Sequence, residues 1–240
     1  MENKIKLSAR LEMSARMVGR TGCVADIGCD HAHTDIWLLG NNAADRCVAM
    51  DVRKGPLEKA KANLEQYGCS DKVELRLSDG LDALKPGEAQ CIIIAGMGGI
   101  VMRNILERGL GPEGHLYGSD PVLVLQPQSH IYEVRKWLYD NLYVITDEDM
   151  CREEGKYYFS MKAEKASRKG SIAEEELHFG PVLLKRKPPV LARYLRELSD
   201  KAGRRLAQIK NSDSDDAVLK KAYFENIEKM IGEFTWITSR

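Results

Sequence analysis

The chain has 240 residues, which suits one large domain or one domain with an appendage. Lys and Arg together number 36, and so do Asp and Glu, so the overall charge does not indicate nucleic-acid binding and any basic surface must come from local segregation of charge. No apolar run reaches the roughly 18 residues of a membrane-spanning helix, and the start MENKIKLSAR lacks a signal peptide's apolar core, so we expect a cytoplasmic protein with no membrane partner.

Short apolar runs alternate with helical patterns from residue 21 to about residue 163. The predicted strands are 23–27, 47–51, 73–77, 91–95, 122–126, 143–150 and 156–161. Alternation of strand and helix predicts a doubly wound, mostly parallel α/β sheet, and the last two strands, which follow each other without a helix, predict an antiparallel hairpin at its edge. Seven strands ending in a hairpin are typical of Rossmann-like methyltransferases rather than of dehydrogenases.

The pattern changes after this sheet, and two apolar stripes with a helical spacing follow. They consist of Leu191, Leu195, Leu198, Ala202, Leu206 and Ile209, and of Leu219, Tyr223, Ile227, Met230, Phe234 and Ile237. The segment NSDSDD between them has the composition of a turn and a helix cap. We therefore expect an α/β domain over residues 1–163 and a helical domain over residues 164–240 that contains a short antiparallel coiled coil.

Charge is segregated within the helical domain. Residues 185–210 contain nine Lys or Arg residues against two acids, whereas residues 213–233 contain six acids against three lysines. One interpretation is two solvated faces that attract each other across the hairpin. The other is that the basic arm contacts an RNA backbone through Lys185, Arg186, Lys187, Arg193, Arg204 and Arg205.

The stretch VADIGCDHAHTD, residues 24–35, begins like a nucleotide-binding strand and turn. A pyrophosphate would have to approach bare amides after Gly28, but Asp30 occupies the second glycine position and would place one negative charge against another. S-adenosylmethionine carries no phosphate. Asp26 or Asp30 could meet its ammonium group, and the helix start beyond the turn could take its carboxylate. The turn therefore favours a cationic donor over NAD or FAD.

Three further strand ends agree with this interpretation. Asp51 ends the second strand, where a carboxylate accepts hydrogen bonds from ribose hydroxyls, and Asp79 after the third strand could accept from the adenine amino group. Gly96 follows the fourth strand, where ligands must pass close to the backbone. Alternatively, the two aspartates are turn residues and His31 is a structural histidine. No spacing of His, Cys and Asp predicts a metal site.

The fourth strand also bears on the methyl acceptor. Enzymes that methylate exocyclic amines usually have Asn or Asp, Pro, Pro and an aromatic residue at this place, whereas this chain has AGMGG. A ring nitrogen such as adenine N1 has a free lone pair and needs alignment and dehydration more than a strong base. Because N1 lies on the Watson–Crick edge, the base must be unpaired or swung out of its stack.

Six segments resemble one known family: LSARL (7–11), ADIGCDHA (25–32), SDGL (78–81), IAGMGG (94–99), LQP (125–127) and RKWLY (135–139). Together they are similar to the bacterial tRNA adenine-N1 methyltransferases that modify position 22, the TrmK family. The resemblance extends from the amino terminus to about residue 163. It implies a class I methyltransferase fold, S-adenosylmethionine as donor and a D-loop adenine of tRNA as acceptor.

The resemblance also implies a set of site residues. The donor pocket would be lined by Arg10, Asp26, Gly28, Asp30, His31, Asp51, Val52, Asp79, Gly80, Gly96 and Met97. Gln126 and Gln128 would face the target base, and His33 could still stack on it. Apart from the resemblance, charge alone leads us to expect that Asp30 stabilises the cationic product base. The chain departs from the family pattern at His33, Thr34 and Asp35, where the family usually has Tyr, Leu and Pro, and at Gln128, where it usually has Asn.

We therefore predict an S-adenosylmethionine-dependent tRNA methyltransferase that acts on adenine N1 as a monomer without a metal. Two alternatives stay open. The departures at residues 33–35 and 128 also suit an RNA-binding module that keeps the fold but not the chemistry. A methyltransferase for a small molecule or a protein would use the same donor pocket without the basic arm.

Overall fold

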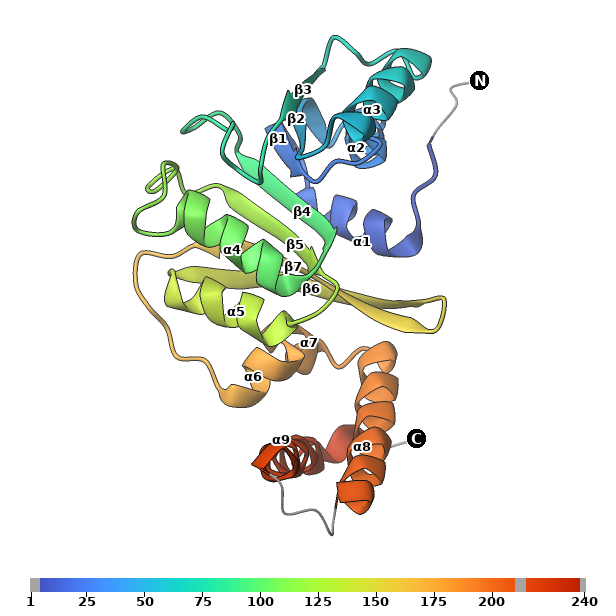
Figure 1. Cartoon of the computed structure of the whole chain (residues 1–240), viewed down its shortest axis with the longest axis vertical. Helices are drawn as coiled ribbons and strands as arrows, with labels where there is room; N and C mark the ends of the chain where they lie inside the picture. Colours follow the sequence, from blue (N-terminus) through green and yellow to red (C-terminus); the bar gives the residue numbers. More distant parts are fainter. Residues whose placement is uncertain (1–4, 210–214, 238–240) are drawn as a thin grey trace. The chain divides into compact units, whose positions relative to one another are not determined.

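The computed structural model describes residues 5–209 and 215–237 (Figure 1). The chain divides into two compact units, residues 1–182 and 183–240. The first unit contains one seven-stranded sheet, with strand order β3-β2-β1-β4-β5-β7-β6. Its strands are β1 (Thr21–Ile27), β2 (Ala44–Asp51), β3 (Val73–Leu77), β4 (Cys91–Met97), β5 (Val122–Pro127), β6 (Tyr143–Glu153) and β7 (Lys156–Lys165).

All seven predicted strands are confirmed, and five neighbouring strands, β3-β2-β1-β4-β5, pair in parallel. β6 and β7 form the predicted antiparallel hairpin at the sheet edge. β7 pairs with β5, antiparallel to it, and so connects the hairpin to the parallel strands. Both hairpin strands are longer than predicted: β6 continues to Glu153 in the two-stranded ribbon that protrudes in Figure 1, and β7 continues to Lys165 within the sheet, where it pairs with β6.

Helices cover both faces of the sheet. One apolar cluster joins it to α4 (Gly99–Leu110) and α5 (Ile131–Asp140), and a second joins it to α1 (Ala9–Val18), α2 (His33–Gly40) and α3 (Lys54–Gln66). Successive strand residues contribute to the two clusters in turn. In β4, Ile92 and Ile94 belong to the first cluster, and Cys91 and Ile93 to the second.

The division between the units lies after Val182, whereas the sequence predicted a boundary after residue 163. The difference arises because β7 continues to Lys165 and the following chain packs back on the sheet domain through α6 (Glu174–Phe179). Arg135 of α5 donates hydrogen bonds to the carbonyl oxygens of Leu177 and His178. The same guanidinium forms a fully buried ion pair with Glu148 of β6.

The second unit consists mainly of α8 (Pro189–Ile209) and α9 (Asp215–Gly232), preceded by α7 (Pro181–Arg186) and followed by a short 3₁₀ helix, Thr235–Ile237. Leu191, Leu195 and Ala202 of α8 are buried, in agreement with the predicted stripe. Residues 211–214 of the predicted NSDSDD turn lie outside the described residues.

The predicted stripe of α9 is wrong at two positions, because Leu219 and Tyr223 are exposed. Ile227 and Met230 of the predicted stripe are buried, together with Ala217 and Ile231, which the stripe did not include. In Figure 1, α9 is seen almost end-on while α8 lies in the plane of the view, so the two helices cross. The structure therefore does not confirm an antiparallel coiled coil.

Candidate active site

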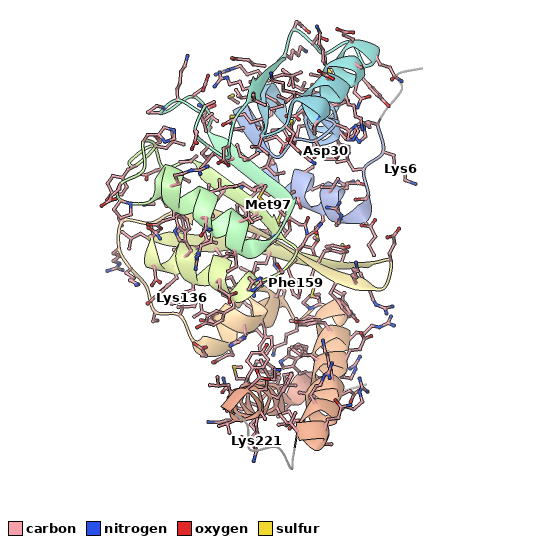
Figure 2. The ribbon with its side chains drawn as sticks, viewed as in Figure 1. Lys6, Asp30, Met97, Lys136, Phe159 and Lys221 are labelled. Carbon is pink, nitrogen blue, oxygen red and sulfur yellow. The ribbon has the colours of Figure 1, made fainter. Side chains whose placement is uncertain are left out.

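A pocket of about 520 Å³ lies at the carboxyl ends of β1, β2, β3 and β4. This volume suits one small-molecule ligand, and the position is the one where open α/β sheets bind ligands. Figure 2 marks two of its residues, Asp30 and Met97, which come from different elements. The pocket brings together all the predicted donor residues and His33: Arg10, Asp26, Gly28, Asp30, His31, His33, Asp51, Val52, Asp79, Gly80, Gly96 and Met97.

The turn between β1 and α2 is closely packed against the end of β2. The amide groups of Gly28 and Cys29 both donate to the carbonyl oxygen of Met50. Gly28, Asp30 and Ala32 all have positive φ angles, of 77°, 49° and 57°. Gly28 adopts this conformation without strain, whereas the two side-chain-bearing residues adopt one that is uncommon for them. The fold thus maintains an unfavourable backbone conformation at the predicted donor turn.

Two acidic residues lie deep in the pocket. Asp51 is 6% exposed, and its Oδ1 accepts a hydrogen bond of 2.9 Å from the amide of Arg53, which fixes the carboxylate at the end of β2. Burial and the neighbouring Asp35 carboxyl raise the pKa of Asp26 well above its usual range. Asp26 therefore holds its proton more readily than an ordinary aspartate, which the sequence did not indicate.

The two histidines of the turn stack on each other, with ring centroids 5.6 Å apart. Asn63 of α3 fixes the turn, because its Nδ2 donates to the carbonyl oxygen of His31 at 2.9 Å and lies 3.2 Å from Nε2 of His33. Burial lowers the pKa of His33, and the neighbouring His31 imidazole lowers it further. His33 is therefore a neutral aromatic ring at neutral pH.

The opposite rim combines a charged pair with apolar side chains. The carboxylate of Asp79 lies 3.1 Å from Nη2 of Arg108, so this predicted donor residue already has a cationic neighbour. Val52 and Val101 line the same pocket and are more than half exposed. Sequence reasoning missed Val101, and the only available signal was its position in the first turn of the helix after the glycine-rich strand end.

A buried amide lies at the end of β5, beside the pocket. Oε1 of Gln126 accepts hydrogen bonds from Nη1 of Arg10 at 3.2 Å and from the amide of Gly96 at 3.1 Å. The side chain is fully buried, and its Nε2 has no hydrogen-bond partner among the residues that the structure describes. Arg10 also lies over the Tyr158 ring. The hydrogen bond from Arg10, 116 positions away in the sequence, gives the amide a fixed orientation and leaves its Nε2 buried without a partner among the described residues.

Gln128 is exposed, and its backbone amide donates to the carbonyl oxygen of Met97, a residue that lines the pocket. Gln128 itself is not among the lining residues. The six predicted RNA contacts belong to the second unit and are not among the residues that line this pocket: Lys185, Arg186, Lys187, Arg193, Arg204 and Arg205. There, Arg193 pairs with Glu197 and Arg205 with Gln208.

Within residues 5–209 and 215–237, no three His, Cys, Asp or Glu side chains are grouped so that they could hold a metal ion. None of the helices in this part of the chain combines the length and apolar character that a membrane span requires.

The comparisons with known proteins agree with the fold and the pocket. Residues 24–232 match the family described as tRNA (adenine(22)-N(1))-methyltransferase, TrmK. The chain is 36% identical to the tRNA (adenine(22)-N(1))-methyltransferase of Bacillus subtilis over 201 residues, which are 82% of this chain and 83% of that protein. The crystal structure of the B. subtilis protein is similar with a TM-score of 0.85 and 31% identity, covering 96% of this chain and 99% of that one.

A structure from Streptococcus pneumoniae, a candidate tRNA (m1A22) methyltransferase in complex with S-adenosyl-L-methionine, matches with a TM-score of 0.82 and 29% identity. The match covers 95% of this chain and 99% of that one. Fold and pocket together define a Rossmann-like methyltransferase with a mostly parallel seven-stranded sheet. Within this class, the chain belongs to the tRNA (adenine(22)-N(1))-methyltransferase family.

Proposed function

We propose that this protein transfers a methyl group from S-adenosylmethionine to N1 of adenine 22 in tRNA, and that the pocket at the ends of β1 to β4 binds the donor. The observation that carries the proposal is the acidic pocket itself, with Asp26 and Asp51 buried in it and Asp30 at its turn. Such a lining repels a diphosphate and suits a cation with a ribose. Family membership supplies the acceptor.

The residues fit the parts of the donor. Asp51 would accept hydrogen bonds from the ribose hydroxyls, since the amide of Arg53 holds its carboxylate in place. Asp26 and Asp30 would hold the ammonium group, and the apolar side chains of Val52 and Val101 would contact the adenine. Asp79 would share its carboxylate between Arg108 and the adenine amino group. When bound, S-adenosylmethionine supplies a methyl group on an electrophilic sulfonium.

The protein's contribution to the reaction is mainly alignment. Nε2 of Gln126 would donate to the acceptor base, because its Oε1 is already occupied by Arg10 and Gly96. His33 would stack on the base as a neutral ring, which adds no positive charge beside a product that is itself cationic. Asp30, whose side chain is 63% exposed at the turn, would stabilise that product charge. Gln128 would complete the entrance to the site.

The basic arm of the second unit would bind the tRNA backbone, with Arg204 and Arg205 as exposed contacts. We expect the enzyme to act as a monomer in the cytoplasm, where its tRNA substrate is found. Contacts with its backbone would position the folded tRNA on the protein, while the pocket selects the base.

A transfer assay tests this function. We expect methyl-labelled S-adenosylmethionine to label an unmodified tRNA transcript when incubated with the full chain. A transcript with guanine in place of adenine 22 should remain unlabelled, since the target nitrogen is absent. Tight binding of the first transcript without labelling would favour the inactive RNA-binding module, and equal labelling of both transcripts would contradict the assignment of the target position.

The role of the basic arm has a matched test. We expect Arg204→Ala/Arg205→Ala to weaken tRNA binding and to make the plot of log affinity against log salt shallower by up to about 1.4–1.8, which is roughly 0.7–0.9 for each phosphate that is no longer neutralised. Lys220→Ala/Lys221→Ala removes the same charge from α9 and should change neither quantity. If the first variant bound and methylated tRNA like the unmodified protein at every salt concentration, the basic arm would not be the part of the protein that binds the tRNA backbone.

A further inference from the structure

Asp35 is a buried carboxyl group that the chemistry described so far does not use. It lies in the first turn of α2 and is completely buried, and the described part of the chain brings no charged donor to either of its oxygens. An ionised carboxylate without partners is costly to bury, so its presence here requires an explanation.

The neighbour of Asp35 provides this explanation. The Asp35 carboxyl lies within hydrogen-bonding reach of the Asp26 carboxyl, on the pocket wall. Two carboxylates are both acceptors, so they can form a hydrogen bond only if one of them carries a proton. Apart from the backbone amide of Asp35, the remaining groups that act on the pair are acids and thiols, namely Asp51 and Cys47 on β2, Cys29 in the β1–α2 turn and Cys69 between α3 and β3. These surroundings favour a single shared proton over two negative charges.

We propose that Asp35 is a positioning residue for donor binding: it retains one proton on the Asp26–Asp35 pair in the empty pocket, and this proton leaves when the donor's ammonium group binds beside Asp26. The inference rests on the proposed function, because it takes the ammonium of S-adenosylmethionine as the incoming cation. The carboxyl O–H bond breaks, the proton passes to solvent, and Asp26 then faces the ammonium as a carboxylate. Donor binding and proton release are thereby coupled.

The pH dependence has a definite sign. Burial raises the pKa of Asp35 to about 6, and the pKa of Asp26 is also raised, so the free pair retains a proton that unfolded aspartates have lost. The folded protein is therefore destabilised as the pH rises from about 4, the ordinary pKa of aspartate, through these raised values. Donor affinity changes in the opposite direction and increases with pH, because binding requires the proton to leave.

Calorimetric titration of the full chain with S-adenosylmethionine tests the coupling. Measured in buffers of different ionisation enthalpy, binding at pH 6–7 should release close to one proton, and affinity should decrease up to about tenfold between pH 7 and pH 6. The donor's own amino group stays largely protonated in this range. Asp35→Asn should release markedly fewer protons when it binds the donor, because its amide can donate to an ionised Asp26. Its donor affinity should decrease less than about twofold between pH 7 and pH 6.

Two further variants separate this role from a structural one. Asp35→Pro introduces a residue that the first turn of a helix tolerates, and should also reduce the proton count. Asp71→Asn removes an exposed acid and should bind the donor like the unmodified protein. If Asp35 served only to stabilise α2, its variants would change the unfolding temperature but not the number of protons released, which would overturn the inference.

An infrared measurement without donor separates failure of the inference from failure of the proposed function. The unmodified protein at pH 7 should show the C=O band of a protonated carboxyl, and Asp35→Asn should lack it. Absence of this band from the unmodified protein would overturn the shared proton even if the donor bound normally. If the band is present but S-adenosylmethionine does not bind, the proposed function fails and the coupling fails with it.

Discussion

Asp51→Ala should weaken the binding of S-adenosylmethionine at least about 100-fold. Its buried carboxylate is held by the amide of Arg53 and would accept hydrogen bonds from both ribose hydroxyls. Hydrogen bonds to a charged group contribute about 1.5–3 kcal/mol each, and the loss of two corresponds to a factor of roughly 100 or more. Isothermal titration calorimetry of the full chain measures this change directly.

A variant of the same strand provides the control. Asp45→Ala removes an exposed acid of β2 that pairs with Arg20, outside the pocket, and should leave donor affinity unchanged. Thermal unfolding of both variants checks that the loss of binding does not come from loss of the fold. Donor affinity for Asp51→Ala within about threefold of the unmodified protein would show that this carboxylate does not bind the ribose.

Gly99→Ala should destabilise the sheet domain by about 3 kcal/mol and lower its unfolding temperature by roughly 6–12 °C. Gly99 begins α4 and donates to the carbonyl oxygen of Ser129 at 3.0 Å. A Cβ atom here would collide with that oxygen and would lie 2.6 Å from the carbonyl oxygen of His130. Because both obstacles are backbone atoms, the glycine-rich segment before α4 and the β5–α5 segment would have to separate.

Gly55→Ala is the matched substitution in another helix. A Cβ atom at Gly55, in α3, meets no atom within 4 Å, and the change should be neutral or stabilise the protein by up to about 1 kcal/mol. Differential scanning calorimetry compares the two variants. Equal unfolding temperatures would mean that the backbone at the start of α4 is looser than the structure indicates.

The sequence predicted the sheet because strand periodicity and helical spacing are local properties. Buried parallel strands show as short apolar runs, and the reversal between β6 and β7 was visible as a missing helix between two of them. The sequence also predicted Asp51 and Asp79 as pocket residues, because the carboxyl ends of parallel strands meet at one edge of the sheet. These predictions required no knowledge of side-chain packing.

Other features depend on how distant segments pack. Asp35 is buried against Asp26 because α2 folds back on β1, and the hydrogen bond from Arg10 to Gln126 joins α1 to β5. In α9, apolar residues occur on more than one side, so the spacing of Leu219 and Tyr223 was as helical as that of the residues that are buried. Spacing alone could not select the face that packs within the second unit.

The most direct test of the central claim is the identity of the methylated nucleoside in the transfer assay. Digestion of the labelled tRNA and chromatography should yield N1-methyladenosine, because a buried amide beside the pocket and a neutral ring in it would align a ring nitrogen. Recovery of the label as N6-methyladenosine would contradict this account, since an exocyclic amine would then be accepted by a site with AGMGG at the end of β4.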